Sequence, residues 1–143
     1  MVVYSNAAEQ VVSPGQSLTL TKLSYCNCDR RKDCYANTIP GATVSGKGPF
    51  VAAFTGNVSS ATAAVPIELS IAVDGVPIPT SRMVTTPAAA DALENISAVT
   101  GFSGNSCCMS INVTVENTGT NPITVAPNAG LVIWTAYEHR FCG

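Results

Sequence analysis

The chain has 143 residues and a formal net charge of −2, a size that suits one domain with a core of its own. The slight excess of acidic residues argues against nucleic acid as a partner, because phosphate binding needs a basic surface. No stretch approaches the roughly 18 uncharged apolar residues of a membrane span, and residues 1–6 lack the basic start and apolar segment of a signal peptide.

Alternating apolar and polar residues predict β-strands along nearly the whole chain. In chain order, the expected strands cover residues 17–24, 49–59, 67–73, 83–86, 96–102, 109–116, 123–125 and 131–137. Turn-forming residues separate them, for example Asp74-Gly75 and the Asn, Gly and Pro residues of 117–122. Only residues 87–95 look helical, and they are long enough for one or two turns.

These elements predict an all-β protein. About eight short strands separated by turns are typical of an antiparallel β-sandwich of the immunoglobulin or jelly-roll type, with one short helical turn at most. We find no internal repeat and no linker, so we expect residues 1–143 to form a single domain. Residues 1–12 could lie as an extended arm on a neighbouring chain. The expected core or interface residues are Ile67, Leu69, Ile71, Val113, Val115, Ile133 and Trp134.

Charged side chains are scarce, at 11% of residues against roughly 25% in an average soluble domain. Between residues 97 and 137 the only one is Glu116. A free monomer normally carries mixed surface charges that keep it apart from its neighbours. We therefore expect other subunits to cover part of the surface. A neutral surface rich in Ser, Thr, Asn and Ala is the alternative.

Six cysteines allow three interpretations, and the sequence leaves them open. They are Cys26, Cys28, Cys34, Cys107, Cys108 and Cys142. In the first interpretation they form disulfides, within or between chains, once the protein meets an oxidising exterior. In the second, one group binds a structural zinc ion, although its Cys-x-Cys spacing departs from the usual zinc-binding pairs. The zinc ligands would be Cys26, Cys28, Cys34 and either Cys142 or His139. In the third, buried thiols serve as small apolar residues.

The sequence contains no recognisable catalytic constellation. His139 is the only histidine, and no cysteine stands in a known catalytic signature. Motifs for nucleotides or dinucleotides are absent. Trp134 could stack against a sugar, but its neighbours in the run Leu131-Val132-Ile133 favour a place in the core or in an interface. We expect a non-enzymatic protein that has no cofactor.

Several stretches resemble a known group of proteins. They are residues 66–79 (PIELSIAVDGVPIP), 86–90 (TPAAA), 107–118 (CCMSINVTVENT) and 128–133 (NAGLVI). Together they resemble small proteins encoded in the structural-gene regions of tailed phages and prophages of Gram-positive bacteria. Those proteins are similar to the trimeric jelly-roll heads of the tumour-necrosis-factor and complement-C1q class. The similarity covers roughly residues 64–134, about half of the chain.

The resemblance implies a virion structural protein, a homotrimeric capsid decoration or fibre-head protein whose partners include other virion proteins such as the major capsid protein. It implies synthesis in a bacterial cytoplasm, release by lysis and a place on the virion surface, with no membrane or nucleic-acid partner. The alternative is a receptor- or carbohydrate-binding head on a tail or spore surface, with a host glycan as ligand. Exposed aromatic residues would then mark the site: Tyr25, Tyr35 or Tyr137. A third candidate is a zinc-stabilised β-domain with another partner.

Overall fold

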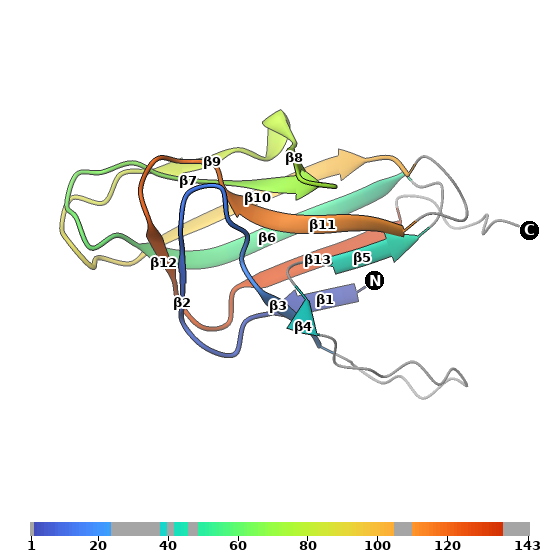
Figure 1. Ribbon diagram of the computed structural model, residues 1–143, viewed down its shortest axis with the longest axis horizontal. Helices are drawn as coiled ribbons and strands as arrows, with labels where there is room; N and C mark the ends of the chain where they lie inside the picture. Colours follow the sequence, from blue (N-terminus) through green and yellow to red (C-terminus); the bar gives the residue numbers. More distant parts are fainter. Residues whose placement is uncertain (1, 24–37, 40–41, 46–48, 105–109, 136–143) are drawn as a thin grey trace, which may run out of the picture.

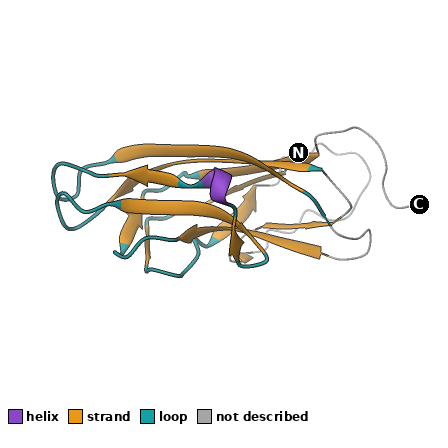
Figure 2. Cartoon of the chain, turned by 90° about the horizontal axis from the view of Figure 1, so that it is seen from above, coloured by secondary structure: helices purple, strands orange, loops and turns teal. Residues whose placement is uncertain are grey.

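The computed structural model describes residues 2–23, 38–39, 42–45, 49–104 and 110–135. These residues form thirteen β-strands and one 3-10 helix of three residues (Figure 1). The strands make two antiparallel sheets that face each other, as the view from above shows (Figure 2). The all-β sandwich that the sequence predicts is confirmed.

The first sheet has eight strands, which come from both halves of the chain. They are β1 (Val2–Ser5), β2 (Gln10–Val12), β3 (Leu20–Leu23), β4 (Thr38–Ile39), β6 (Phe50–Ser59), β10 (Glu94–Phe102), β12 (Ile123–Val125) and β13 (Gly130–Thr135). The second sheet has five strands, namely β5 (Ala42–Ser45), β7 (Ile67–Val73), β8 (Val76–Pro77), β9 (Met83–Thr85) and β11 (Ser110–Asn117). The helix η1 (Pro79–Ser81) lies between β8 and β9 in the chain.

Eight of these strands pair as the strands of a jelly roll do. In chain order the eight are β1, β5, β6, β7, β9, β10, β11 and β13. The first pairs with the eighth, the second with the seventh, the third with the sixth and the fourth with the fifth. Pairing of β13 with β6 and of β11 with β7 then joins these four strand pairs into the two sheets. The sandwich is therefore of the jelly-roll type.

The core lies between the two sheets. Successive side chains of a strand point to opposite faces, so every second residue of the long strand β6 is buried. Phe54 and Val58 of β6 and Leu131 of β13 face Ile71 of β7 and Val113 of β11 across this core, and each of these side chains is at most 1% exposed. The same alternation places the intervening residues of the first sheet on its opposite, outer face.

Residues 2–12 form part of the first sheet of their own chain. β1 lies between β13 and β3, and β2 pairs with β12. The buried side chain of Asn6 fixes the bend between β1 and β2. Its Nδ2 donates to the carbonyls of Ala8 and Ala126, both at 3.0 Å, and its Oδ1 accepts from the N–H of Ala129 at 2.9 Å. The strands that hold this segment lie more than 100 residues away in the sequence, so its local pattern does not reveal them.

Residues 87–95 form a turn and the start of β10, so the expectation of a short helix is wrong. Two hydrogen bonds attach this turn to the preceding loop. The N–H of Ala64 donates to the carbonyl of Pro87 at 2.9 Å, and the N–H of Asp91 donates to the carbonyl of Ser60 at 2.8 Å. Ala64 and Asp91 both have positive φ angles, of 57° and 59°. These long-range bonds outweigh the weak helical propensity of three consecutive alanines.

Candidate interaction surface

The outer face of the first sheet carries a continuous row of apolar side chains. Residues that stand opposite each other in neighbouring strands share a face, so the strand registers define the row. It crosses β3, β1, β13, β6 and β10 in that order, with one residue from each: Leu23, Val3, Val132, Ala53 and Val99. We call this set the apolar row. With strands about 4.8 Å apart, it is roughly 20 Å wide.

The two ends of the apolar row are the most exposed. Leu23 is 43% exposed and Val99 is 65% exposed. The three central residues, Val3, Val132 and Ala53, are half-buried because they are flanked by side chains of neighbouring strands on the same face. A row of this width that includes exposed Leu and Val is an apolar patch of the kind that marks interaction sites.

Trp134 lies in the neighbouring row on the outer face. It stands opposite Val51 of β6, which in turn stands opposite Gly101 of β10. The indole is half-buried, whereas Ile133, the residue before it, is 2% exposed and lies in the core. Trp134 therefore extends the apolar surface and takes no part in the core between the sheets.

On the other side of the apolar row, the outer face is polar but uncharged. The next row consists of Thr21, Ser5, Gly130, Thr55 and Ser97. Beyond it Asn57 and Asn95 stand opposite each other, and the Asn95 amide donates to the Asn57 amide oxygen at 3.1 Å. None of the residues in these four rows carries a charge. A partner that covers this face does not have to desolvate an ion.

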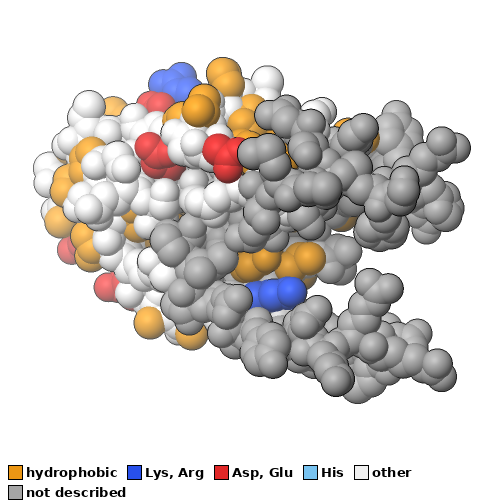
Figure 3. All heavy atoms as spheres, turned by 45° about the vertical axis from the view of Figure 1, so that its right-hand side comes forward, with side chains coloured by type: hydrophobic (Ala, Val, Ile, Leu, Met, Phe, Trp, Pro, Cys, Tyr) orange, Lys and Arg blue, Asp and Glu red, His pale blue; other side chains and the backbone are white. Residues whose placement is uncertain are grey.

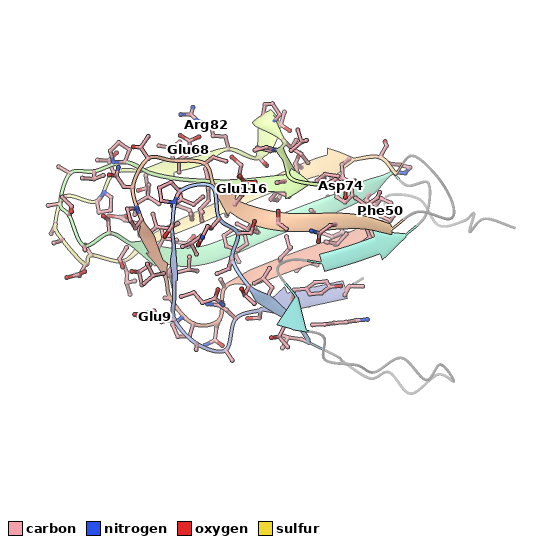
Figure 4. All side chains as sticks on the ribbon, viewed as in Figure 1. Glu9, Phe50, Glu68, Asp74, Arg82 and Glu116 are labelled. Carbon is pink, nitrogen blue, oxygen red and sulfur yellow. The ribbon has the colours of Figure 1, made fainter. Side chains whose placement is uncertain are left out.

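The charged groups of the described residues lie elsewhere and are scattered. Figure 3 shows few blue and red side chains among the described residues on the face in view. The closest pair is in the second sheet, where the Arg82 guanidinium reaches both carboxylate oxygens of Glu68 at 3.1 Å (Figure 4). The hydrogen bond from Arg82 holds the pKa of the Glu68 carboxyl below its ordinary value, burial opposes this shift, and the Thr118 hydroxyl, also at 3.1 Å, lowers the pKa further. Such an exposed pair stabilises the fold only slightly.

The structure separates the predicted core or interface residues into two groups. Six of the seven are buried between the sheets: Ile67, Leu69, Ile71, Val113, Val115 and Ile133. The seventh, Trp134, lies on the outer face. The cysteines, His139 and the three tyrosines named above all fall outside the described residues. Within the described ranges, no three His, Cys, Asp or Glu side chains gather in a way that could hold a metal ion.

Comparison of the sequence with models of protein families and with curated proteins finds no match in either set. In the part of the chain that the structure describes, no helix is long and apolar enough to cross a membrane. The most distinctive surface of the described residues is thus the uncharged outer face of the first sheet.

The sequence did not reveal the residues of the apolar row. Its five members come from five strands that span residues 3–132, and only Val132 stands in one of the stretches that carry the resemblance. The available signal was the scarcity of charge, which predicts a covered surface but does not place it. The strand registers supply the missing positions.

Proposed function

We propose that this protein is a non-enzymatic structural subunit that forms a homotrimer through the outer face of its first sheet and decorates the surface of a phage virion. The observation that carries the proposal is the apolar row, which runs unbroken across five strands of a face without charge. A subunit working alone would leave this row in water, whereas packing against further copies removes it from solvent.

The chemistry of the outer face supports assembly rather than catalysis. Among the described residues, its four rows hold apolar, hydroxyl-bearing or amide-bearing side chains, and these rows include no acid or base that could activate a hydroxyl near neutral pH. Trp134 offers the kind of large aromatic side chain that anchors protein interfaces. The jelly-roll pairing and the resemblance to phage surface proteins agree with this role. The virion location itself rests on that resemblance.

Light scattering coupled to gel filtration tests the trimer directly. The wild-type protein at micromolar concentration should have three times the chain mass of 14.7 kDa. Val132→Asp places a carboxylate in the centre of the apolar row and should abolish the trimer, because the charge would have to be buried. Val76→Asp is the matched control. Val76 is 68% exposed on β8 of the second sheet, so the trimer should persist in this variant.

Two results would overturn the trimer. One is a monomeric wild-type protein, and the other is an equal effect of Val132→Asp and Val76→Asp. Circular dichroism confirms that each variant keeps its strands, and Leu23→Asp at the exposed end of the row is a milder second variant. Mass spectrometry of purified phage particles, released by lysis of the cells that encode the protein, tests the virion role separately. Absence of the protein from the particles would contradict that role.

A further inference from the structure

The strand β10 has one free edge. One of its edges pairs with β6 through nine consecutive residue pairs, from Glu94 opposite Val58 to Phe102 opposite Phe50. Among the described residues, no strand pairs with its other edge, and no loop donates a backbone hydrogen bond to it. About half of the backbone N–H and C=O groups of an edge strand point away from the sheet. At β10 these groups form a row roughly 30 Å long, given about 3.4 Å per residue.

The edge strands β2, β8 and β9 are protected in ways that β10 is not. β2 has three residues and is followed by Pro14, β8 has two and contains Pro77, and β9 has three and directly follows Arg82. Short length, proline and positive charge are the devices by which proteins prevent edge-to-edge pairing. β10 has nine residues, no proline and no Lys or Arg, and its register with β6 contains no bulge. Its only charge is Glu94, at its first position.

β10 is also held in the conformation that a pairing partner needs. β6 fixes it along its whole length, and η1 contacts it at the margin of the sandwich, where the hydroxyl of the exposed Thr80 lies 2.8 Å from that of Thr100. Side chains on its outer side are small or β-branched: Ser97, Val99 and Gly101. A strand that is already extended loses little conformational entropy when a second strand joins it.

We propose that β10 pairs antiparallel with β10 of a second copy, so that two first sheets become one continuous sheet. The backbone groups on the free edge require an extended strand as partner. Two identical antiparallel strands are related by a two-fold axis, so a second copy supplies a complementary edge without any further surface. Residues 95–102 carry no charge, and the two Glu94 carboxylates lie at opposite ends of the pair, so no like charges oppose each other.

The apolar row continues across this junction. Val99, the most exposed residue of the row, stands one position from the centre of β10, so the partner's Val99 comes close to it on the same outer face. Pairing therefore shields the apolar side chain that a single copy exposes most within the row. The edge is a different surface from the one used in the proposed trimer, and the pairing stands whether or not the trimer forms. At micromolar concentration the trimer is the expected form, and the edge pairing adds to it as concentration rises, so that assemblies larger than a trimer then form.

The experiment uses the Val132→Asp variant, in which the proposed trimer is disrupted. This variant should form a dimer of twice 14.7 kDa, and hydrogen exchange should slow for about half of the amides of residues 94–102 as concentration rises. Adding Ser97→Lys brings two positive charges together at the centre of the pair and should weaken the dimer by roughly tenfold or more. Adding Thr55→Lys is the control, because Thr55 stands opposite Ser97 in the same polar row but one strand away from the edge.

The outcomes separate this inference from the proposed function. A Val132→Asp variant that remains monomeric at all concentrations would overturn the β10 pairing and leave the trimer intact. Equal weakening by Ser97→Lys and Thr55→Lys would overturn it as well, since association would then occur through the face. If Val132→Asp remains trimeric, the proposed trimer interface is wrong, and exchange at residues 94–102 still decides the edge: concentration-dependent protection supports the pairing, and its absence refutes it.

Discussion

Asn6 provides the strongest test of the arrangement of the first twelve residues. Its side chain is 2% exposed and joins the bend between β1 and β2 to the turn between β12 and β13. Asn6→Ala deletes all three hydrogen bonds of the amide while removing little apolar volume. The buried N–H of Ala129 and the carbonyl of Ala126 then lose their partners, while the carbonyl of the exposed Ala8 can turn to water.

The expected loss in unfolding free energy follows from these groups. An orphaned buried N–H costs roughly 1–3 kcal/mol, and a partly buried carbonyl lies toward the lower end of that range, which gives about 3 kcal/mol in total. In a domain of this size, the loss corresponds to a fall in Tm of about 10 °C. Urea unfolding followed by circular dichroism measures it, with Asn112→Ala as control. Asn112 is exposed on β11, so its replacement should change the stability by less than about 0.5 kcal/mol.

A small loss in unfolding free energy on Asn6→Ala would contradict this role of the Asn6 amide. If Asn6→Ala costs less than about 1 kcal/mol at an unchanged dependence on urea, the amide does not hold β1 and β2 in the sandwich. Residues 2–12 would then be free to leave the sheet, as an arm would. A large effect that Asn112→Ala shares would also contradict it, because the loss would then not depend on burial.

Two further substitutions test local features. Ala64→Gly should raise the Tm by about 2–4 °C, because the positive φ of 57° costs an L-residue about 1–2 kcal/mol. Glycine's greater freedom in the unfolded chain offsets only part of that gain. A fall in Tm would contradict the loop conformation. Glu68→Gln should flatten the decline in stability below about pH 4.3. A carboxyl with a lowered pKa stabilises the fold above the pKa that it has in the unfolded chain, and this stabilisation is lost as the pH falls through its pKa in the folded state. Urea midpoints between about pH 3 and pH 6 measure this effect, and parallel curves for both proteins would refute it.

The strands were predictable where residues alternate strictly. Residues 67–73 and 110–116 show the period of two because one face of each strand meets the core while the other carries small or polar side chains, and the structure has strands there. The helical interpretation of residues 87–95 failed because local propensity is weak compared with two hydrogen bonds from a distant loop. β1 and β2 were missed for a related reason, since three- and four-residue strands gain their stability from remote partners.

The sequence predicted that a candidate surface exists but not which residues form it. Scarce charge predicts a covered face, but which residues share that face depends on the registers of five strands. The run Leu131-Val132-Ile133-Trp134 shows the difficulty, because four consecutive apolar residues contain no alternation that says which side is buried. The structure turns Leu131 and Ile133 inward and leaves Val132 and Trp134 on the outer face. The free edge of β10 is likewise a property of the pairing and not of its sequence.

The pairing of β1 with β13 has a consequence for biosynthesis. β1, the first of the described strands, lies between β3 and a strand that ends at residue 135, so the centre of the first sheet cannot close until nearly the whole described chain has left the ribosome. Until then, the edges of β6 and β1 that pair with β13 have no partner strand. Contacts between such distant residues form slowly, and chains that wait with exposed strands are prone to aggregate. Folding of this jelly roll should therefore be completed only after residue 135 has been synthesised, and its yield should depend on temperature and on chaperones during synthesis.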